Sequence, residues 1–164
     1  MNYFNQHPEV KLVIAPHVID ENHLVEIIRK LKRPYVRYTR ADEKNVRKAD
    51  CLIIDCFGLL SSIYRYGEIA YIGGGFGVGI HNTLEAAVYG IPVIFGPKYQ
   101  KFQEAIQLLE AKGAFSVKDY EELKTLLDRM LTDEVFLRES GMNASNYVTG
   151  NAGATDKIMS MINF

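Results

Sequence analysis

The sequence has little net charge, few cysteines and no long apolar run. A net charge of −1 and a pI near 6.4 give no broad positive surface, so we expect no nucleic-acid partner. The basic cluster at 29–33 is interpreted as the solvated end of a helix, because cations favour helix C-termini. The two cysteines, Cys51 and Cys56, flank an apolar run and have no histidine at ligand spacing, which argues against a zinc site or a disulfide scaffold. No apolar stretch reaches the roughly 18 residues of a membrane helix, and residues 1–7 lack the charged and apolar regions of a signal peptide. These absences favour a reducing, cytoplasmic setting.

Apolar runs alternate along the chain with amphipathic segments, and this βαβα rhythm predicts a parallel sheet with helices on both faces. Strands are predicted at 11–15, 35–37, 51–55, 69–72, 92–95 and 114–117. Helices are predicted from a cap at Asp20 to a break at Pro34, from Asp119 onward, and at 58–66, 81–89, 100–111, 134–147 and 152–162. Because 48% of the 164 residues are hydrophobic, we expect one compact domain, 1–150, followed by a last helix at 151–164.

A glycine-rich loop joins the predicted strand 69–72 to the predicted helix 81–89. Glycines leave the backbone uncovered, and the first amides of a helix have no partner within the helix, so we expect this loop to hold a phosphate. Its spacing matches neither the Rossmann pattern G-x-G-x-x-G nor the phosphate-loop pattern G-x-x-x-x-G-K-[ST]. The glycines assigned to the candidate site are Gly74, Gly75, Gly77 and Gly79.

Four loops follow predicted strands and are expected to share one edge of the sheet, which is where open parallel sheets bind ligands. They contain Pro16 and His17, residues 55–58, the glycine loop with His81 and Asn82, and residues 96–98. Glu85 lies one helical turn further on. This spacing allows one helix to offer amides to a phosphate and a carboxylate to sugar hydroxyls.

The run from Asp55 through the glycine loop to His81-Asn-Thr-Leu-Glu85, and on to Phe95-Gly-Pro97, resembles the carboxy-terminal half of bacterial 3-deoxy-D-manno-octulosonic acid (Kdo) transferases. The resemblance covers most of the chain. It implies an α/β fold, a Rossmann-like parallel sheet flanked by helices, as one half of a GT-B fold. It also implies that residues 1–150 bind the donor, CMP-Kdo or CMP, and that a lipid A precursor is the acceptor of Kdo during lipopolysaccharide biosynthesis.

The same resemblance places the general base and the lipid acceptor groove in the amino-terminal half of the family's proteins. The chain is therefore expected to hold no catalytic residue, to need no metal or cofactor, and not to transfer Kdo alone. The implied mechanism is direct displacement at the anomeric carbon, with helix amides stabilising the charge on departing CMP. The parent enzyme is expected at the cytoplasmic face of the inner membrane, and any membrane contact would come through it. The last helix, 151–164, is expected to cross to the missing half.

Roles for single residues also follow from the resemblance. Glu85 is implied to bind the ribose of CMP, and Asn82, His81 and neighbouring amides are implied to bind its phosphate. Pro16 and His17 match a loop in which many family members have Pro-Arg facing the nucleotide. Histidine at this position has no permanent charge, although its neutral ring can donate one hydrogen bond. The loop that packs near the base matches Gly58 and Leu59.

Several of these residues also have simpler structural interpretations. The pattern Asn82-x-x-Glu85 resembles a capping box, which would only close a helix end. Asp55 is interpreted as the cap of the helix predicted at 58–66, and Lys98 as an exposed lysine more readily than as a partner of the phosphate or the Kdo carboxylate. For the chain as a whole, the alternatives are the donor half of another GT-B enzyme that uses a UDP-sugar, and a non-catalytic interaction domain.

Overall fold

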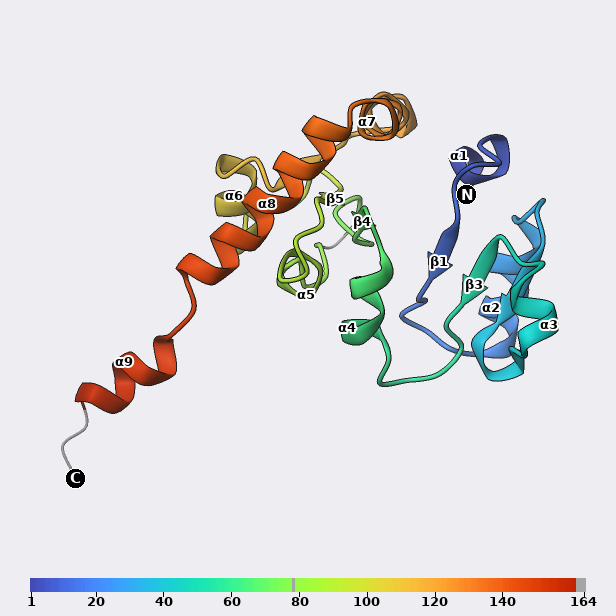
Figure 1. Ribbon diagram of the computed structural model, residues 1–164, viewed down its shortest axis with the longest axis horizontal. Coiled ribbons are helices and arrows are strands. Elements are labelled where there is room, and N and C mark those ends of the chain that lie inside the picture. Colours follow the sequence, from blue (N-terminus) through green and yellow to red (C-terminus); the bar gives the residue numbers. More distant parts are fainter. Residues whose placement is uncertain (78, 162–164) are drawn as a thin grey trace. The chain divides into compact units, whose positions relative to one another are not determined.

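The computed structural model describes residues 1–77 and 79–161 (Figure 1). The chain divides into two compact units, Met1–Ile63 and Tyr64–Phe164. Each unit contains a three-stranded parallel sheet with helices packed against it. The division falls between Ile63 and Tyr64, whereas the sequence suggests a boundary only near Gly150, the last residue of a helix. The assignments of 1–150 to donor binding and of 151–164 to a crossing helix stay predictions.

The sheet of unit 1 has β3 (Cys51–Ile53) in its centre, paired in parallel with β1 (Leu12–Ile14) and β2 (Tyr35–Arg37). The predicted strands 11–15 and 51–55 are thus each shortened to three residues. Helix α2 (Glu21–Arg29) begins where the sequence predicts, because the Asp20 side chain accepts a hydrogen bond of 3.0 Å from the amide of His23. The buried core of this unit comprises Phe4, Leu24, Ile27, Cys51 and Ile53.

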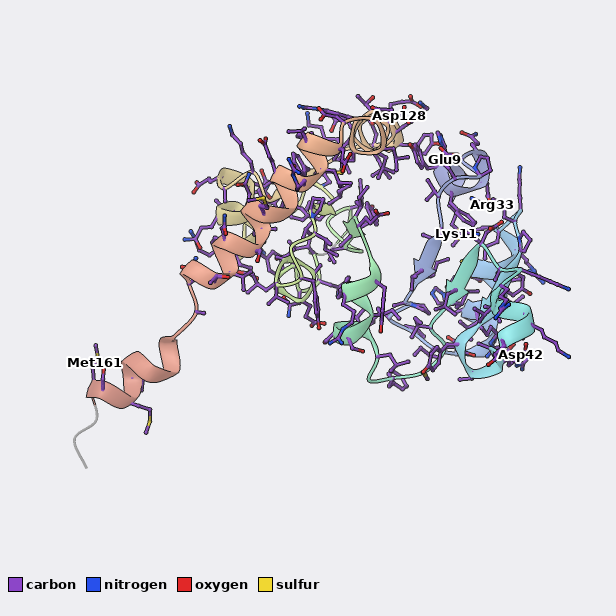
Figure 2. The ribbon with its side chains drawn as sticks, viewed as in Figure 1. Glu9, Lys11, Arg33, Asp42, Asp128 and Met161 are labelled. Carbon is purple, nitrogen blue, oxygen red and sulfur yellow. The ribbon has the colours of Figure 1, made fainter. Side chains whose placement is uncertain are left out.

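Two short helices of unit 1 lie in stretches for which the sequence predicts no element. Helix α1 (Asn2–Gln6) buries Tyr3 and Phe4. Helix α3 (Glu43–Val46) follows the 3-10 turn η1 (Tyr38–Arg40) and starts with a capping box, in which the Asp42 carboxylate accepts from the Asn45 amide and the Asn45 side chain accepts from the Asp42 amide (Figure 2). A single helical turn offers too few residues for a periodic pattern, and of these two helices only α3 has capping side chains that signal its start.

Arg33 ties the segment between α1 and β1 to the sheet of unit 1. Its Nη1 donates to the carbonyl oxygens of Phe4, His7 and Val10 at 2.8, 2.7 and 3.0 Å. Its Nε donates to Asp50 at 3.3 Å, and Asp50 also pairs with Lys11; Figure 2 labels Arg33 and Lys11 in this part of the unit. The interpretation of the 29–33 cluster as a solvated helix end is therefore wrong for Arg33, whose side chain is only 12% exposed.

Unit 2 contains the two longest described helices, α7 (Tyr120–Thr132) and α8 (Glu134–Gly150). Its other helices are α5 (Leu84–Ala87), α6 (Gln103–Glu110) and α9 (Ala154–Met161). Asp119 caps α7 as predicted, accepting from the Glu122 amide at 2.9 Å. The predicted helix 58–66 is instead a turn of α-helix, α4 (Leu60–Ile63), followed by the 3-10 turn η2 (Tyr64–Tyr66). Ile162, the predicted end of the last helix, lies outside the described residues.

The sheet of unit 2 is buried on both faces. Its central strand β5 (Val93–Phe95) pairs in parallel with β4 (Ala70–Tyr71) and β6 (Ala114–Ser116). Val93 and Phe95 pack with residues of α5, α6 and α8, whereas Ile94 belongs to a second cluster with residues of α7. Since successive side chains of a strand point to opposite faces, helices cover both sides of β5, as the βαβα pattern predicts.

No helix in the described ranges, 1–77 and 79–161, is long and apolar enough to cross a membrane.

Candidate functional site

The glycine loop of unit 2 closes into a small hairpin between β4 and α5. Gly74 and Ile80 form an antiparallel bridge at its base. Within the loop the Gly75 amide donates to the Gly79 carbonyl oxygen at 2.8 Å, and the His81 amide donates to the Gly73 carbonyl oxygen at 3.3 Å. Several backbone groups of the predicted phosphate cradle therefore bind one another, which gives the loop a defined shape.

Three of the four glycines assigned to the site are required by the packing of this hairpin. Gly74 and Gly75 have positive φ values of +94° and +79°, and a Cβ at Gly75 would lie 2.8 Å from the backbone of Gly96. A Cβ at Gly79 would lie 2.9 Å from the ring of Phe102. Gly77 differs, because a Cβ there would meet no atom within 4 Å. The packing of the described residues thus gives no reason for glycine at position 77.

The helix that follows the loop is much shorter than the predicted 81–89, and this prediction is wrong. The side-chain oxygen of Asn82 accepts from the Leu84 amide at 3.0 Å, a local turn that keeps residues 82–83 out of the helix. The helix α5 therefore covers only Leu84–Ala87. A helix of this length has little dipole, and the anion site that the sequence predicts at its first amides stays a prediction.

Asn82 and Glu85 contact each other directly. The Nδ2 of Asn82 donates to Oε1 of Glu85 at 3.1 Å. A capping box would have the Asn82 oxygen accept from the Glu85 amide three residues on, but this oxygen accepts from Leu84 instead. One hydrogen bond therefore joins the two side chains predicted to bind phosphate and ribose, next to the exposed His81.

Thr83, between Asn82 and the start of α5, is completely buried. Its hydroxyl has no hydrogen-bond partner among the residues that the structure describes, and it makes no cap bond to α5. Buried hydroxyls in proteins are usually paired, so this one is an unusual feature of the turn.

Lys98, just after β5, holds the glycine hairpin at two points. Its amide donates to the Gly75 carbonyl oxygen at 2.9 Å, and its Nζ donates to the Gly77 carbonyl oxygen at 3.2 Å. The side chain is exposed, as predicted for a lysine that faces solvent. That prediction did not include the hydrogen bond from its ammonium to the Gly77 carbonyl oxygen.

The other candidate residues follow β1 and β3, which are neighbours in the sheet of unit 1. Pro16 is half-buried and His17 exposed, two and three residues after the end of β1. Gly58 is exposed, and Leu59 is half-buried with a carbonyl oxygen that accepts from the Ser62 hydroxyl at 3.0 Å. Both pairs thus follow the carboxyl ends of adjacent parallel strands. That they share one edge with the loops of unit 2 stays a prediction.

Asp55 does not cap the helix predicted at 58–66, and that interpretation is wrong. Its buried carboxylate accepts from the amide and the hydroxyl of Thr39 at 2.9 and 2.6 Å, and from Nε of Arg37 at 2.7 Å. Burial raises the pKa of Asp55, but these hydrogen bonds outweigh burial and lower the pKa to about 2. Sequence spacing carried no signal of this network, because Thr39 and Arg37 precede Asp55 by 16 and 18 residues.

The described residues contain no group of three or more histidine, cysteine, aspartate or glutamate side chains that could hold a metal ion. Cys51 and Cys56 are free thiols. Burial raises the pKa of Cys51 to about 12, so this thiol packs in the core as an uncharged group.

Comparison with known proteins identifies the relatives of this chain. No protein-family model matches the sequence. A 3-deoxy-D-manno-octulosonic acid transferase of Aquifex aeolicus (strain VF5) is 37% identical over 125 residues, which cover 75% of this chain and 34% of the relative. A 3-deoxy-D-manno-octulosonic acid transferase of Rickettsia bellii (strain RML369-C) is 32% identical over 116 residues, which cover 69% of this chain and 28% of the relative. The chain is a homologue of the Kdo transferases. It spans about a third of the length of these Kdo transferases.

Solved structures show the same α/β fold. The C-terminal CMP-Kdo binding domain of WaaA from Acinetobacter baumannii aligns with a TM-score of 0.75 at 18% identity, covering 90% of this chain and 78% of that domain. The C-terminal domain of a glycosyl transferase group 1 family protein (LpcC) from Francisella tularensis gives a TM-score of 0.61 at 16% identity, covering 93% and 75%. The predicted resemblance to Kdo transferases and the predicted α/β class are both confirmed.

Proposed function

We propose that the chain is the donor-binding part of a Kdo transferase, which binds CMP-Kdo so that Kdo can be transferred to a lipid A precursor in lipopolysaccharide biosynthesis. The observation that carries the proposal is the Asn82–Glu85 pair beside the ordered glycine hairpin. The Acinetobacter domain of similar fold is a CMP-Kdo binding domain, which supports CMP-Kdo as the ligand of this chain. The parent enzyme would act at the cytoplasmic face of the inner membrane.

The pair is suited to two neighbouring parts of a nucleotide. A carboxylate only accepts hydrogen bonds, so Glu85 fits the hydroxyls of a ribose. The Nδ2 of Asn82 has two hydrogens, of which one is used for Glu85 at 3.1 Å. The second is available for a phosphate oxygen, and the bond between the side chains sets the orientation of both groups before the nucleotide arrives.

In this mechanism the chain binds the donor and stabilises the leaving group. An acceptor hydroxyl attacks the anomeric carbon of Kdo while the bond to the phosphate oxygen of CMP breaks. Hydrogen-bond donors around the glycine hairpin stabilise the negative charge that appears on CMP. We assign the general base to the rest of the parent protein, because the chain corresponds to only 34% of its Aquifex relative. That His17, with Pro16, and Gly58, with Leu59, also contact the nucleotide stays a prediction.

Calorimetric titration of the 164-residue chain with CMP and with UDP tests the proposal. CMP is expected to bind more tightly than UDP, and Glu85→Gln is expected to weaken CMP binding about tenfold, the effect of losing hydrogen bonds to a charged group. Glu139→Gln, a change at an exposed carboxylate on α8, is the matched control. Tighter UDP binding would favour another GT-B donor half. No binding of either nucleotide, with Glu85→Ala altering only stability, would favour a non-catalytic domain.

A further inference from the structure

Lys98 is anchored to the glycine hairpin through both its backbone and its side chain. The amide contact to Gly75, at 2.9 Å, places the residue beside the loop, and the Nζ contact to Gly77, at 3.2 Å, places the ammonium at the loop's tip. The two partners lie more than twenty residues earlier in the sequence. This contact places a positive charge beside the Gly77 carbonyl oxygen of the candidate site.

Position 77 lies in open space among the described residues. A Cβ at Gly77 would meet none of their atoms within 4 Å beyond its chain neighbours, whereas a Cβ at Gly75 or Gly79 would collide with neighbouring groups. No contact among the described residues therefore requires glycine at position 77. A glycine of this kind is suited to the close approach of a ligand to the backbone.

The other candidate residues near the hairpin supply no permanent positive charge. Asn82 is neutral, Glu85 is negative, and His81 is charged only when protonated. A lysine ammonium has three hydrogens, of which one is used for the Gly77 carbonyl oxygen. The remaining two can be donated to an anion without breaking the contact that orders the loop.

We propose that Lys98 is a phosphate-binding residue of the candidate site, whose ammonium bridges the Gly77 carbonyl and a phosphate oxygen of the nucleotide. This inference rests on the proposed nucleotide-binding function and adds a positively charged side chain to the proposed contacts with the nucleotide. The bridge links the hairpin to the ligand. The ammonium thus supplies a positive charge to the phosphate and holds the loop in place beside it. The ligand class it selects is a nucleoside monophosphate or its ester, in preference to the nucleoside.

Titration of Lys98→Met with CMP and with cytidine tests this assignment, because methionine keeps a long apolar side chain without the charge. CMP affinity is expected to fall about tenfold or more, as charge-assisted hydrogen bonds contribute about 1.5–3 kcal/mol. Cytidine affinity is expected to stay within about twofold, since cytidine has no phosphate. Lys98→Arg, which keeps the charge, is expected to recover part of the loss. The matched control is Lys101→Met, at an exposed lysine three residues away, for which CMP affinity should be unchanged.

The outcomes separate this inference from the proposed function. If the unaltered chain binds no nucleotide, the proposed function fails and the inference fails with it. If the unaltered chain binds CMP and Lys98→Met binds it equally well, only the inference is overturned. An equal loss of CMP and cytidine affinity would also overturn it, because that result indicates a disturbed loop. Weakened binding of CMP-Kdo with normal binding of CMP would assign Lys98 to the sugar carboxylate and overturn the phosphate contact.

Discussion

Arg37 donates its Nε hydrogen to the carboxylate of Asp55 at 2.7 Å, joining the ends of the neighbouring strands β2 and β3. The same guanidinium binds Glu21 at the start of α2, at 2.8 and 2.9 Å. Asp55 directly precedes the loop that carries Gly58 and Leu59. The pair therefore holds in place the base of a loop that we assign to the nucleotide site.

The low pKa of Asp55 predicts how the stability of unit 1 depends on pH. Its pKa of about 2 lies below the value near 3.9 of an unfolded aspartate. The carboxylate thus contributes stability that is complete above about pH 4 and is lost as the pH falls toward 2, by about 2 kcal/mol in total. Urea unfolding followed from about pH 6 to about pH 2 should show this loss.

Asp55→Asn is expected to remove that part of the acid dependence and to lower stability at neutral pH. Glu121→Gln, at an exposed carboxylate of α7, serves as the control and should keep the dependence of the unaltered chain. If Asp55→Asn lost stability in acid to the same extent as the unaltered chain, the carboxylate would not be the group responsible.

Arg33→Lys is expected to destabilise unit 1. The guanidinium donates to four carbonyl oxygens and to Asp50, and a lysine cannot reproduce this planar set of donors. We expect a loss of about 2–3 kcal/mol, with faster amide hydrogen exchange in α1 and β1. Arg47→Lys, at an exposed arginine of the same unit, should change neither measurement. Unchanged exchange in α1 would show that Arg33 does not hold this segment.

Alanine should lower the stability of the protein at one glycine of the hairpin and leave it unchanged at another. Gly75→Ala places a Cβ at 2.8 Å from Gly96 on a residue with φ of +79°, so we expect a loss of about 2 kcal/mol or more. Gly77→Ala places a Cβ in open space and should leave the denaturation midpoint nearly unchanged. The comparison is made by urea unfolding of both variants, and equal destabilisation would contradict the hairpin geometry.

Thr83→Val should be neutral or slightly stabilising. The hydroxyl of Thr83 is buried without a partner among the described residues, and replacing an unpaired polar group with a methyl group removes a desolvation cost of about 1–3 kcal/mol. Thermal unfolding followed by circular dichroism measures the change. A fall of several degrees in Tm would indicate that the hydroxyl is hydrogen-bonded in the folded protein.

The 164-residue chain is expected not to transfer Kdo by itself. It corresponds to 34% of the Aquifex relative, and we place the general base outside it. Incubation with CMP-Kdo and a lipid A precursor, followed by mass spectrometry of the lipid, should show no added Kdo even where titration shows bound CMP. Transfer above the level of a Glu85→Gln control would contradict this expectation.

Much of the fold could be predicted because the signals are local. Apolar runs marked the six strands of the described residues to within two residues at each end, and Asp20 and Asp119 marked the starts of α2 and α7. The helix at 81–89 was wrong because the Asn82 side chain competes with the backbone for the Leu84 amide. Helices α1 and α3 were missed because each has only about one turn.

The sequence by itself determined the α/β class, the relationship to Kdo transferases and the residues of the glycine motif, because periodicity and motif spacing are properties of neighbouring residues. Only the tertiary structure decided that Thr39 and Arg37 bind Asp55, that Arg33 binds the α1–β1 segment, and that Lys98 holds Gly77. The partners in these pairs come from different strands and loops, and they meet only because parallel pairing brings distant segments to the same end of a sheet.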